Sequence, residues 1–316
     1  MSTGPILLAQ GAALDALLRE AEGCQQAGQW QQAELLLRRV LDVAPDHVPA
    51  LQSLAELASR FGHHQAAAEL MARLEQVQSD LALSRDADYA EQPQSPWAAG
   101  DCLLEEIHGS GTVLVLFAGL GVGRSPPTFI FRKFLAPYAH IDKLFIRDLS
   151  LNWYLRGIPG IAADVDATAR YLASRISGYR RTVFLGCSAG ATAAILFGEL
   201  LRVDKVIAFA PQAMLSDRKP AEMGDGRWEQ RLAVLRRELG NSRHLDLVNF
   251  NPFRTAVDVY YHSGALLDCA HAQLLRGSSL TLQPQPGAGH LIALQMRDNG
   301  LLRPIIDREV SRQSSD

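Results

Sequence analysis

Cysteine is scarce in this sequence, and its four copies, Cys24, Cys102, Cys187 and Cys269, lie far apart. No two of them form the closely spaced pair that many zinc sites and redox motifs use, so we expect no metal site and no other cofactor. The same scarcity argues against a disulfide framework and favours the reducing environment of the cytoplasm.

Long hydrophobic runs are also missing. No uncharged apolar stretch approaches the ~20 residues that a membrane-spanning helix needs. The apolar stretch around Pro5 to Ala9 has no basic leader and is soon followed by Asp15, which argues against a secretory signal peptide. The formal net charge is -3, and Lys and Arg are scattered along the chain. We therefore expect neither nucleic acid nor an anionic membrane as a partner.

The length of 316 residues suggests one large and one small domain, and the first 80 residues contain an internal repeat. Small residues let two helices pack closely, a glycine marks the turn between them, and Pro45 ends the second helix. A shift of 34 positions aligns five pairs of similar residues: Leu17 with Leu51, Ala21 with Ala55, Gly28 with Gly62, Ala33 with Ala67, and Val40 with Leu74.

In period and residue types, residues 14–79 resemble the tetratricopeptide repeat. Two unrelated amphipathic hairpins are the alternative, and the second copy is the weaker one because His64 stands where Trp30 does. A solenoid needs about three repeats to bury a continuous core, so two repeats are expected to pack against the second domain or a partner protein.

Residues 81–100 hold Asp86, Asp88, Glu91, Pro93 and Pro96 among few aliphatic residues, and we interpret them as a linker. Beyond it, short apolar strands alternate with helices, as is typical of a parallel sheet buried on both faces. The predicted domains are a repeat domain (1–80), the linker (81–100) and an α/β domain (101–316). The expected strands are 112–117, 143–147, 182–185, 205–209, 257–261 and 279–282, and the expected helices are 162–176, 189–201, 228–239, 268–275 and 291 onward.

The segment Gly186-Cys187-Ser188-Ala189-Gly190 joins an expected strand to a helix of small apolar residues. A sharp strand-to-helix turn holds its central serine at a strained angle and requires small neighbours, which the two glycines provide. Ser188 is therefore the candidate nucleophile, and a glycine-rich turn without chemistry is the alternative. Cys187 is expected to point away from the site because successive strand residues face opposite sides.

A serine hydroxyl needs an imidazole to take its proton and a carboxylate to orient that imidazole. With an elbow serine the carboxylate and then the histidine follow along the chain. His290 fits best because it lies in a glycine-rich loop after the last expected strand. His244 precedes a strand, His262 ends one, and His271 lies inside a helix.

Three carboxylates are candidates for the acid. Asp268 is the first to follow the strand 257–261, and Asp217 follows the strand 205–209. Asp258 stands at the wrong end of its strand. We predict Asp268, with Asp217 as the runner-up and a plain helix N-cap as the alternative role of Asp268.

The developing oxyanion needs backbone N–H donors already in place. Ala189, directly after the nucleophile, is one candidate, and Leu120 and Gly121 in the glycine-rich loop 118–123 are the others. A dinucleotide-binding fingerprint is excluded there because it would require glycine at Arg124, and two prolines interrupt the expected helix.

The elbow, the order of serine, carboxylate and histidine, and the strand–helix alternation resemble the α/β-hydrolase superfamily over residues 110–310. The resemblance implies a mostly parallel sheet with helices on both faces and a serine-esterase activity. It also puts the common acid position at Ala265, so Asp268 takes that role by default. Five further segments resemble bacterial hydrolase-like proteins, some of which occur with glycan-modifying or secretion-associated enzymes: Phe145-Ile-Arg147-Asp148, Trp153-Tyr154, Gly157, Ala208-Phe-Ala-Pro-Gln212 and Asp268-x-x-His271-Ala272.

Arg147, Trp153 and Tyr154 follow the carboxyl end of a strand, where open α/β sheets bind ligands. They are candidates for substrate binding, and packing of an aromatic loop is the alternative. Residues 213–254 are long for a connection and would suffice for a small cap over the site.

The leading functional prediction is a serine hydrolase that cleaves a small-molecule or glycan-linked carboxylic ester through an acyl-enzyme. An acyltransferase would use the same triad with another acceptor in place of water. A protein-interaction scaffold with a weakly active hydrolase fold is the non-enzymatic alternative. Sequence does not separate hydrolysis from transfer, because the choice of acceptor depends on pocket shape and exclusion of water.

Overall fold

The computed structural model divides the chain into two compact units, Met1–Gln78 and Ser79–Asp316. The predicted linker, residues 81–100, lies outside the described residues. The structure describes residues 13–14, 16–21, 23–25, 27–63, 65–67, 69–70, 73–74, 77, 102–120, 127, 129, 131–220, 223, 225–287 and 290–311.

The first unit is helical and contains α2 (Trp30–Val43) and α3 (Val48–Arg60). Gly28 and Gly62 both adopt a positive φ, 74° and 75°, in turns where a side chain would be strained. The two aligned glycines therefore share a turn conformation, while the tetratricopeptide resemblance itself stays a prediction. The alanines aligned by the 34-residue shift are all buried: Ala21, Ala33, Ala55 and Ala67.

A seven-stranded sheet forms the centre of the second unit, with the strand order β1-β3-β2-β4-β5-β6-β7. The first strand pairs antiparallel with its neighbour, and every other pair is parallel. The strands are β1 (Leu103–Glu106), β2 (Thr112–Phe117), β3 (Asp142–Ile146), β4 (Arg181–Cys187), β5 (Lys205–Phe209), β6 (Val257–His262) and β7 (Leu280–Gln285).

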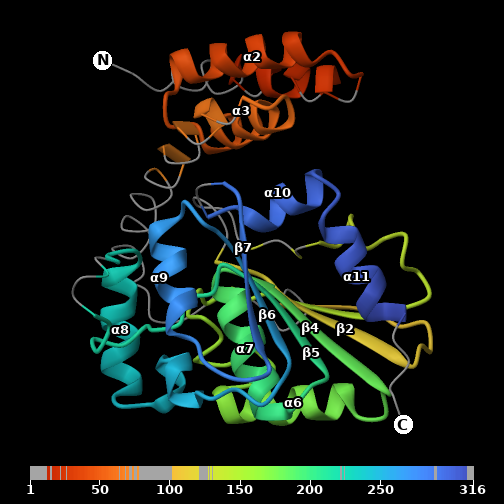
Figure 1. Ribbon diagram of the computed structural model, residues 1–316, viewed down its shortest axis with the longest axis vertical. Coiled ribbons are helices and arrows are strands. Elements are labelled where there is room, and N and C mark those ends of the chain that lie inside the picture. The colour runs from red at the N-terminus through yellow and green to blue at the C-terminus, as the bar shows by residue number, and fades with distance from the viewer. Residues whose placement is uncertain are drawn as a thin grey trace. The chain divides into compact units, whose positions relative to one another are not determined.

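Helices cover both faces of this sheet (Figure 1). The mostly parallel sheet between helices confirms the predicted α/β-hydrolase class of fold. The helices are α6 (Val165–Ile176), α7 (Ala189–Leu201), α8 (Glu229–Leu239), α9 (Leu266–Leu274), α10 (Ile292–Asp298) and α11 (Leu302–Ser311), with short 3-10 turns η2 (Arg243–Leu245) and η3 (Leu247–Phe250).

Alternate residues of each strand supply the two hydrophobic cores. In β2, Val113, Val115 and Phe117 pack on the side of α6, α7 and α9, whereas Leu114 and Leu116 pack on the side of α10 and α11. Because both faces are covered, the strand is apolar at nearly every position, which explains the continuous hydrophobic runs in the sequence.

The sequence reading missed β1, which has only four residues and is partly exposed at the edge of the sheet. Such a short, half-exposed segment lacks the apolar run that marks the central strands. The other strands and helices of the second unit lie within a few residues of their expected ranges.

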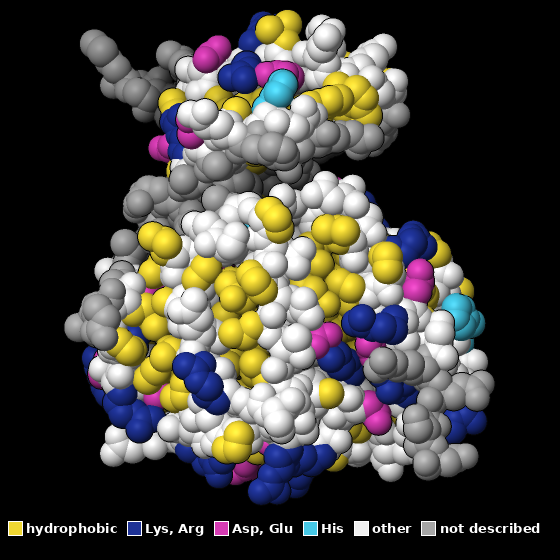
Figure 2. Space-filling model, in the orientation of Figure 1, with side chains coloured by type: hydrophobic (Ala, Val, Ile, Leu, Met, Phe, Trp, Pro, Cys, Tyr) yellow, Lys and Arg dark blue, Asp and Glu magenta, His cyan; other side chains and the backbone are white. Residues whose placement is uncertain are grey.

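On the face shown in Figure 2, Lys and Arg side chains of the second unit occur in small groups among other side chains, and apolar side chains reach the surface between them. None of the helices within the described residues combines the length and apolarity that crossing a membrane requires.

Candidate active site

Ser188 occupies a sharp turn between β4 and α7. Its backbone has φ 53° and ψ −124°, a conformation that L-residues rarely adopt. The turn is fixed from both sides: the Ser188 N–H donates to the carbonyl of Phe209 at 2.8 Å, and the Ser188 carbonyl accepts from Ala191 at 2.9 Å. The serine side chain is thus displayed at the carboxyl end of a central strand.

The two flanking glycines are required by close backbone contacts. A Cβ at Gly186 would overlap the carbonyl of Gly190, and a Cβ at Gly190 would overlap the carbonyl of Phe117 and lie 2.6 Å from that of Ala118. The predicted need for small residues on both sides of Ser188 is confirmed: the first turn of α7 packs tightly against Gly186 at the end of β4 and against the chain that leaves β2.

The segment after β2 lies beside the elbow. A Cβ built on Gly119 would stand 3.6 Å from the Ser188 Cβ and 3.1 Å from the carbonyl of Cys187. Within the described part of the chain, the Ala189 N–H has no backbone acceptor. These positions fit the predicted oxyanion donors Ala189 and Leu120, while Gly121 lies outside the described residues.

Asp268 and His290 are in direct contact, although 22 residues separate them. The Nδ1 of His290 lies 3.0 Å from Oδ1 and 2.9 Å from Oδ2 of Asp268. His290 follows β7 and precedes α10, and Asp268 is in the first turn of α9. The N-cap of α9 is Ala265, without a side-chain cap, so the alternative role of Asp268 as N-cap is wrong.

The Asp268 carboxylate is an ionised, buried partner for the imidazole. Only 1% of Asp268 is exposed, and it also accepts a hydrogen bond of 3.3 Å from Nη1 of Arg227. Burial alone would raise the pKa of Asp268, but His290 and Arg227 outweigh it and hold the pKa below its ordinary value. A carboxylate that stays charged keeps the Nδ1–H of His290 pointed at itself.

The competing carboxylates are engaged elsewhere. The side chain of Asp217 is 81% exposed and pairs with Arg236 at 2.6 Å. Asp258 lies near the beginning of β6, at the end of the sheet opposite the elbow, and pairs with Lys205 at 2.7 Å. Neither is placed to take over the contact that Asp268 makes with His290.

The other three downstream histidines have structural contacts. His244 stacks on Phe250, and Nε2 of His262 contacts Oε1 of Gln295. His271, on the buried side of α9, is fully buried. Their positions agree with the choice of His290 from the sequence.

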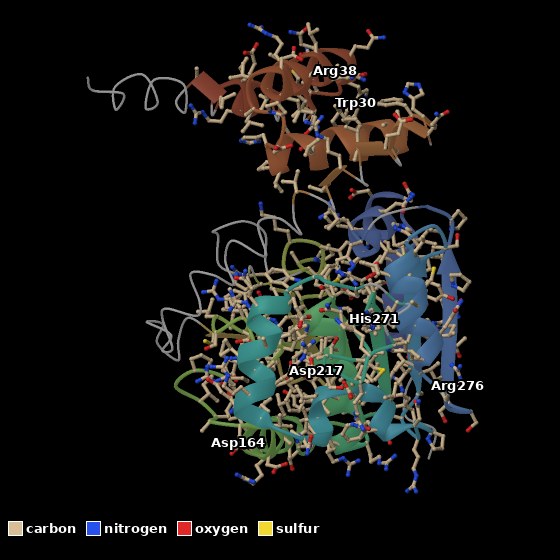
Figure 3. The ribbon with its side chains drawn as sticks, turned by 90° about the vertical axis from the view of Figure 1, so that its left-hand side faces the viewer. Trp30, Arg38, Asp164, Asp217, His271 and Arg276 are labelled. Atoms are coloured by element: carbon tan, nitrogen blue, oxygen red, sulfur yellow. The ribbon has the colours of Figure 1, made fainter. Side chains whose placement is uncertain are left out.

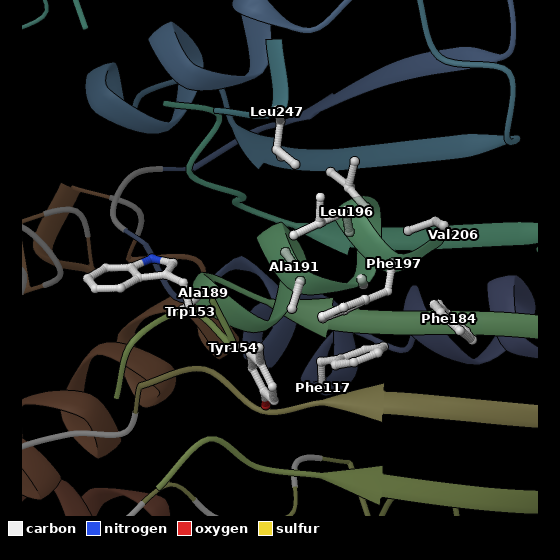
Figure 4. Packing of buried hydrophobic residues seen from close by; sticks show 14 of the residues in the cluster. Phe117, Trp153, Tyr154, Phe184, Ala189, Ala191, Leu196, Phe197, Val206 and Leu247 are labelled. Carbon is white, nitrogen blue, oxygen red and sulfur yellow. The ribbon is translucent and has the colours of Figure 1, made fainter. Parts of the chain in front are cut away.

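Trp153 and Tyr154 are fully buried, which favours packing over contact with a substrate. The Tyr154 hydroxyl lies 2.9 Å from the carbonyl oxygen of Ala118 and 3.1 Å from that of Ile146, and can donate to either. In Figure 4 the Tyr154 ring lies beside Phe117, with the hydroxyl turned toward the chain that leaves β2. The side chain therefore holds the segment that flanks Ser188.

Arg147 and Trp153 likewise bond within the protein. Arg147 donates to the carbonyl of Pro127 at 3.2 Å and lies over the ring of Phe129. Trp153 donates to Oε1 of Gln212 at 2.6 Å. Their role in binding a substrate stays a prediction.

The sequence did not point to two residues near the site, Asp225 and Arg227. Both are nearly fully buried, and Arg227 contacts Asp268. They belong to residues 213–254, which were long enough for a small cap over the site. In the structure this connection contains α8, η2 and η3, and many of its described apolar residues join the core on the α7 side. Nothing local in the sequence marks an arginine that will be buried against a distant carboxylate.

Cys187 packs on the α10 side of the sheet, as expected for the neighbour of the elbow serine. Burial raises the pKa of its thiol, so the thiolate that a cysteine nucleophile needs is disfavoured.

No family model and no curated protein matches this sequence. Among solved structures, the chain is similar to the capsule O-acetyltransferase of Neisseria meningitidis serogroup A, with 14% identity, 65% of this chain and 90% of the other covered, and a TM-score of 0.46. It is also similar to a thermophilic esterase from Thermogutta terrifontis, with 17% identity, coverage of 66% and 94%, and a TM-score of 0.43.

A third similar structure is an α/β hydrolase enzyme from a sediment metagenome of the Mar Chica lagoon, Morocco, with 18% identity, coverage of 65% and 94%, and a TM-score of 0.43. At these identities and TM-scores the similarity concerns the course of the chain and does not bear on the reaction.

Proposed function

We propose that this chain is a serine hydrolase that cleaves a carboxylic ester through an acyl-enzyme, with Ser188 as nucleophile, His290 as general base and Asp268 as the orienting acid. The contact between Asp268 and Nδ1 of His290 is the observation that carries the proposal. It leaves Nε2 as the ring nitrogen that takes a proton, and it joins the first turn of α9 to the segment between β7 and α10.

In the first half of the reaction, Oγ of Ser188 attacks the acyl carbonyl while Nε2 of His290 takes the hydroxyl proton. Asp268 stabilises the imidazolium that forms. The N–H groups of Ala189 and of the segment around Leu120 donate to the oxyanion. The tetrahedral intermediate collapses, the ester C–O bond breaks, and His290 returns its proton to the leaving alkoxide.

In the second half, water attacks the acyl-Ser188 carbonyl and gives a proton to His290. A second tetrahedral intermediate expels Oγ of Ser188, which regains the proton from His290. The products are one carboxylic acid and one alcohol, and the enzyme returns to its starting state without a cofactor.

The test is turnover of short p-nitrophenyl esters by wild type, Ser188→Ala and His290→Ala. Loss of the nucleophile in a triad enzyme costs on the order of 10⁴-fold or more, so both variants should fall to background. Ser174→Ala is the matched control, since the Ser174 hydroxyl lies on the exposed side of α6 and donates to the carbonyl of Tyr171 in the same helix. Near-wild-type rates in both Ser188→Ala and His290→Ala would refute the proposed function.

A further inference from the structure

A buried chain of charged groups continues beyond Asp268, away from His290. Arg227 donates from Nη1 to Asp268 at 3.3 Å and from Nε and Nη2 to the two oxygens of Asp225, at 3.0 and 2.9 Å. Asp225 in turn contacts Nε2 of His271 at 2.8 Å. One guanidinium thus stands between two aspartate–histidine pairs.

The far end of this chain is fixed to the backbone. Nδ1 of His271 accepts the N–H of Ala213 at 3.1 Å, so the proton of the neutral ring is on Nε2, which donates to Asp225. His271, labelled in Figure 3, lies on α9 three residues after Asp268. The histidine therefore holds Asp225 in place from the helix that also carries the acid.

A second set of hydrogen bonds leads from this point back to the elbow. The hydroxyl of Thr192 on α7 donates to the backbone carbonyl of Gln212, next to Ala213, and accepts from the Gln212 N–H, each at 3.0 Å. The Thr192 N–H donates to the carbonyl of Ser188 at 3.0 Å. Gln212 is thus tied to the nucleophile's turn, and Arg227, later in the same connection, to the acid.

Charge balance explains why an arginine suits this position. A lone cation beside Asp268 would cancel the negative charge that stabilises the imidazolium of His290. Here the guanidinium is already paired in a two-pronged contact with Asp225, whose pKa is held below its ordinary value by His271 and Arg227 despite burial. Arg227 can then hold Asp268 while the negative charge next to His290 persists.

We propose that Arg227 is a positioning residue that holds the Asp268 carboxylate against His290, and that Asp225 balances its charge so that His290 keeps its basicity. The inference rests on the proposed function for its effect on turnover. The basicity of His290 can be measured without turnover, which keeps the two proposals separable.

The charged and titratable groups that face His290 along this chain are Asp268 and then Arg227 and Asp225. Cys269 follows Asp268, and its thiol contacts the carbonyl of His262; burial and the Asp268 charge raise the pKa of that thiol, so it stays neutral. The direction in which each substitution shifts the pKa of His290 therefore follows from the charge that is removed, at Arg227 or at Asp225.

The experiment measures the pKa of His290 by NMR titration of its ring, together with the pH profile of kcat/KM. Arg227→Met removes a nearby positive charge and should raise the pKa of His290 by on the order of half a unit to one unit. Asp225→Asn leaves the guanidinium unbalanced and should lower that pKa by a similar amount. In both variants kcat should fall about tenfold to a hundredfold with little change in KM.

The double variant Asp225→Asn with Arg227→Met has no unpaired buried charge and guards against failure to fold. It should return the pKa of His290 close to the wild-type value while kcat stays low, because Asp268 still lacks its donor. Arg181→Met is the matched control: it breaks a buried ion pair with Glu309 at the other end of β4 and should leave the pKa of His290 unchanged.

Opposite shifts in the two single variants support the proposal. Shifts in the same direction, no shift in either, or an equal shift in Arg181→Met would overturn it. These results are read from the ring titration, so they stand even if Ser188→Ala proves to retain full turnover and the proposed function fails.

Discussion

Replacement of Asp268 by asparagine separates an acid that orients His290 from a carboxylate that merely packs there. The Asp268 side chain accepts the Nδ1–H of His290 with both oxygens and is almost fully buried. An asparagine has one oxygen and one NH₂ group. Its NH₂ would favour the imidazole tautomer that has no lone pair for the serine proton.

The magnitude follows from comparable chemistry. A triad with the wrong tautomer loses about 10⁴-fold in kcat, which at about 1.4 kcal/mol per tenfold corresponds to about 5.5 kcal/mol of transition-state stabilisation. Asp268→Asn should therefore lower kcat by roughly 10³- to 10⁴-fold with a small change in KM. The assay is the steady-state rate with a short p-nitrophenyl ester.

Asp217→Asn and Asp258→Asn are the controls, because one is exposed and the other pairs with Lys205. Both should stay within a few-fold of the wild-type rate. The reasoning is refuted if Asp268→Asn also stays within tenfold, or if either control falls as far as Asp268→Asn does.

Three further predictions concern stability and positioning. Gly190→Ala should lower the free energy of unfolding in urea by about 1–3 kcal/mol or more, since the added Cβ would meet two backbone carbonyls. Gly226→Ala is the control: a Cβ there has open space, so the free energy of unfolding should change little. Tyr154→Phe keeps the packed ring but removes the hydroxyl that holds the segment beside the elbow, and should lower kcat about tenfold in the ester assay while KM changes little. Asp225 and Asp268 have lowered pKa values in the folded state, so the stability they contribute is complete above about pH 4 and is lost as the pH falls further. The free energy of unfolding in urea, measured between pH 6 and 3, should show this loss. A flat profile over that range would contradict it.

The parts of the site that depend on local sequence could be predicted from it. The elbow around Ser188 needs glycines at two fixed positions, and His290 lies in a loop between a strand and a helix. Asp268 was chosen from chain order, and its contact with His290 is present in the structure. These candidates could be named from the sequence because each proposed role requires a residue type at a position that the strand–helix pattern marks.

Other features depend on contacts that no local pattern records. Arg227 reads as an ordinary surface arginine, yet it is buried because Asp225 and Asp268 approach it from different segments. Trp153 and Tyr154 were candidates for a substrate wall because aromatic residues after a strand suit either role; their burial was decided by the core on the α7 side.

The most direct test of the account is the intact mass of the protein after incubation with a fluorophosphonate probe, followed by peptide mapping. The account predicts one adduct per wild-type molecule, located on Ser188, and no adduct on Ser188→Ala. An adduct on another residue, or an equal adduct on Ser188→Ala, would contradict it.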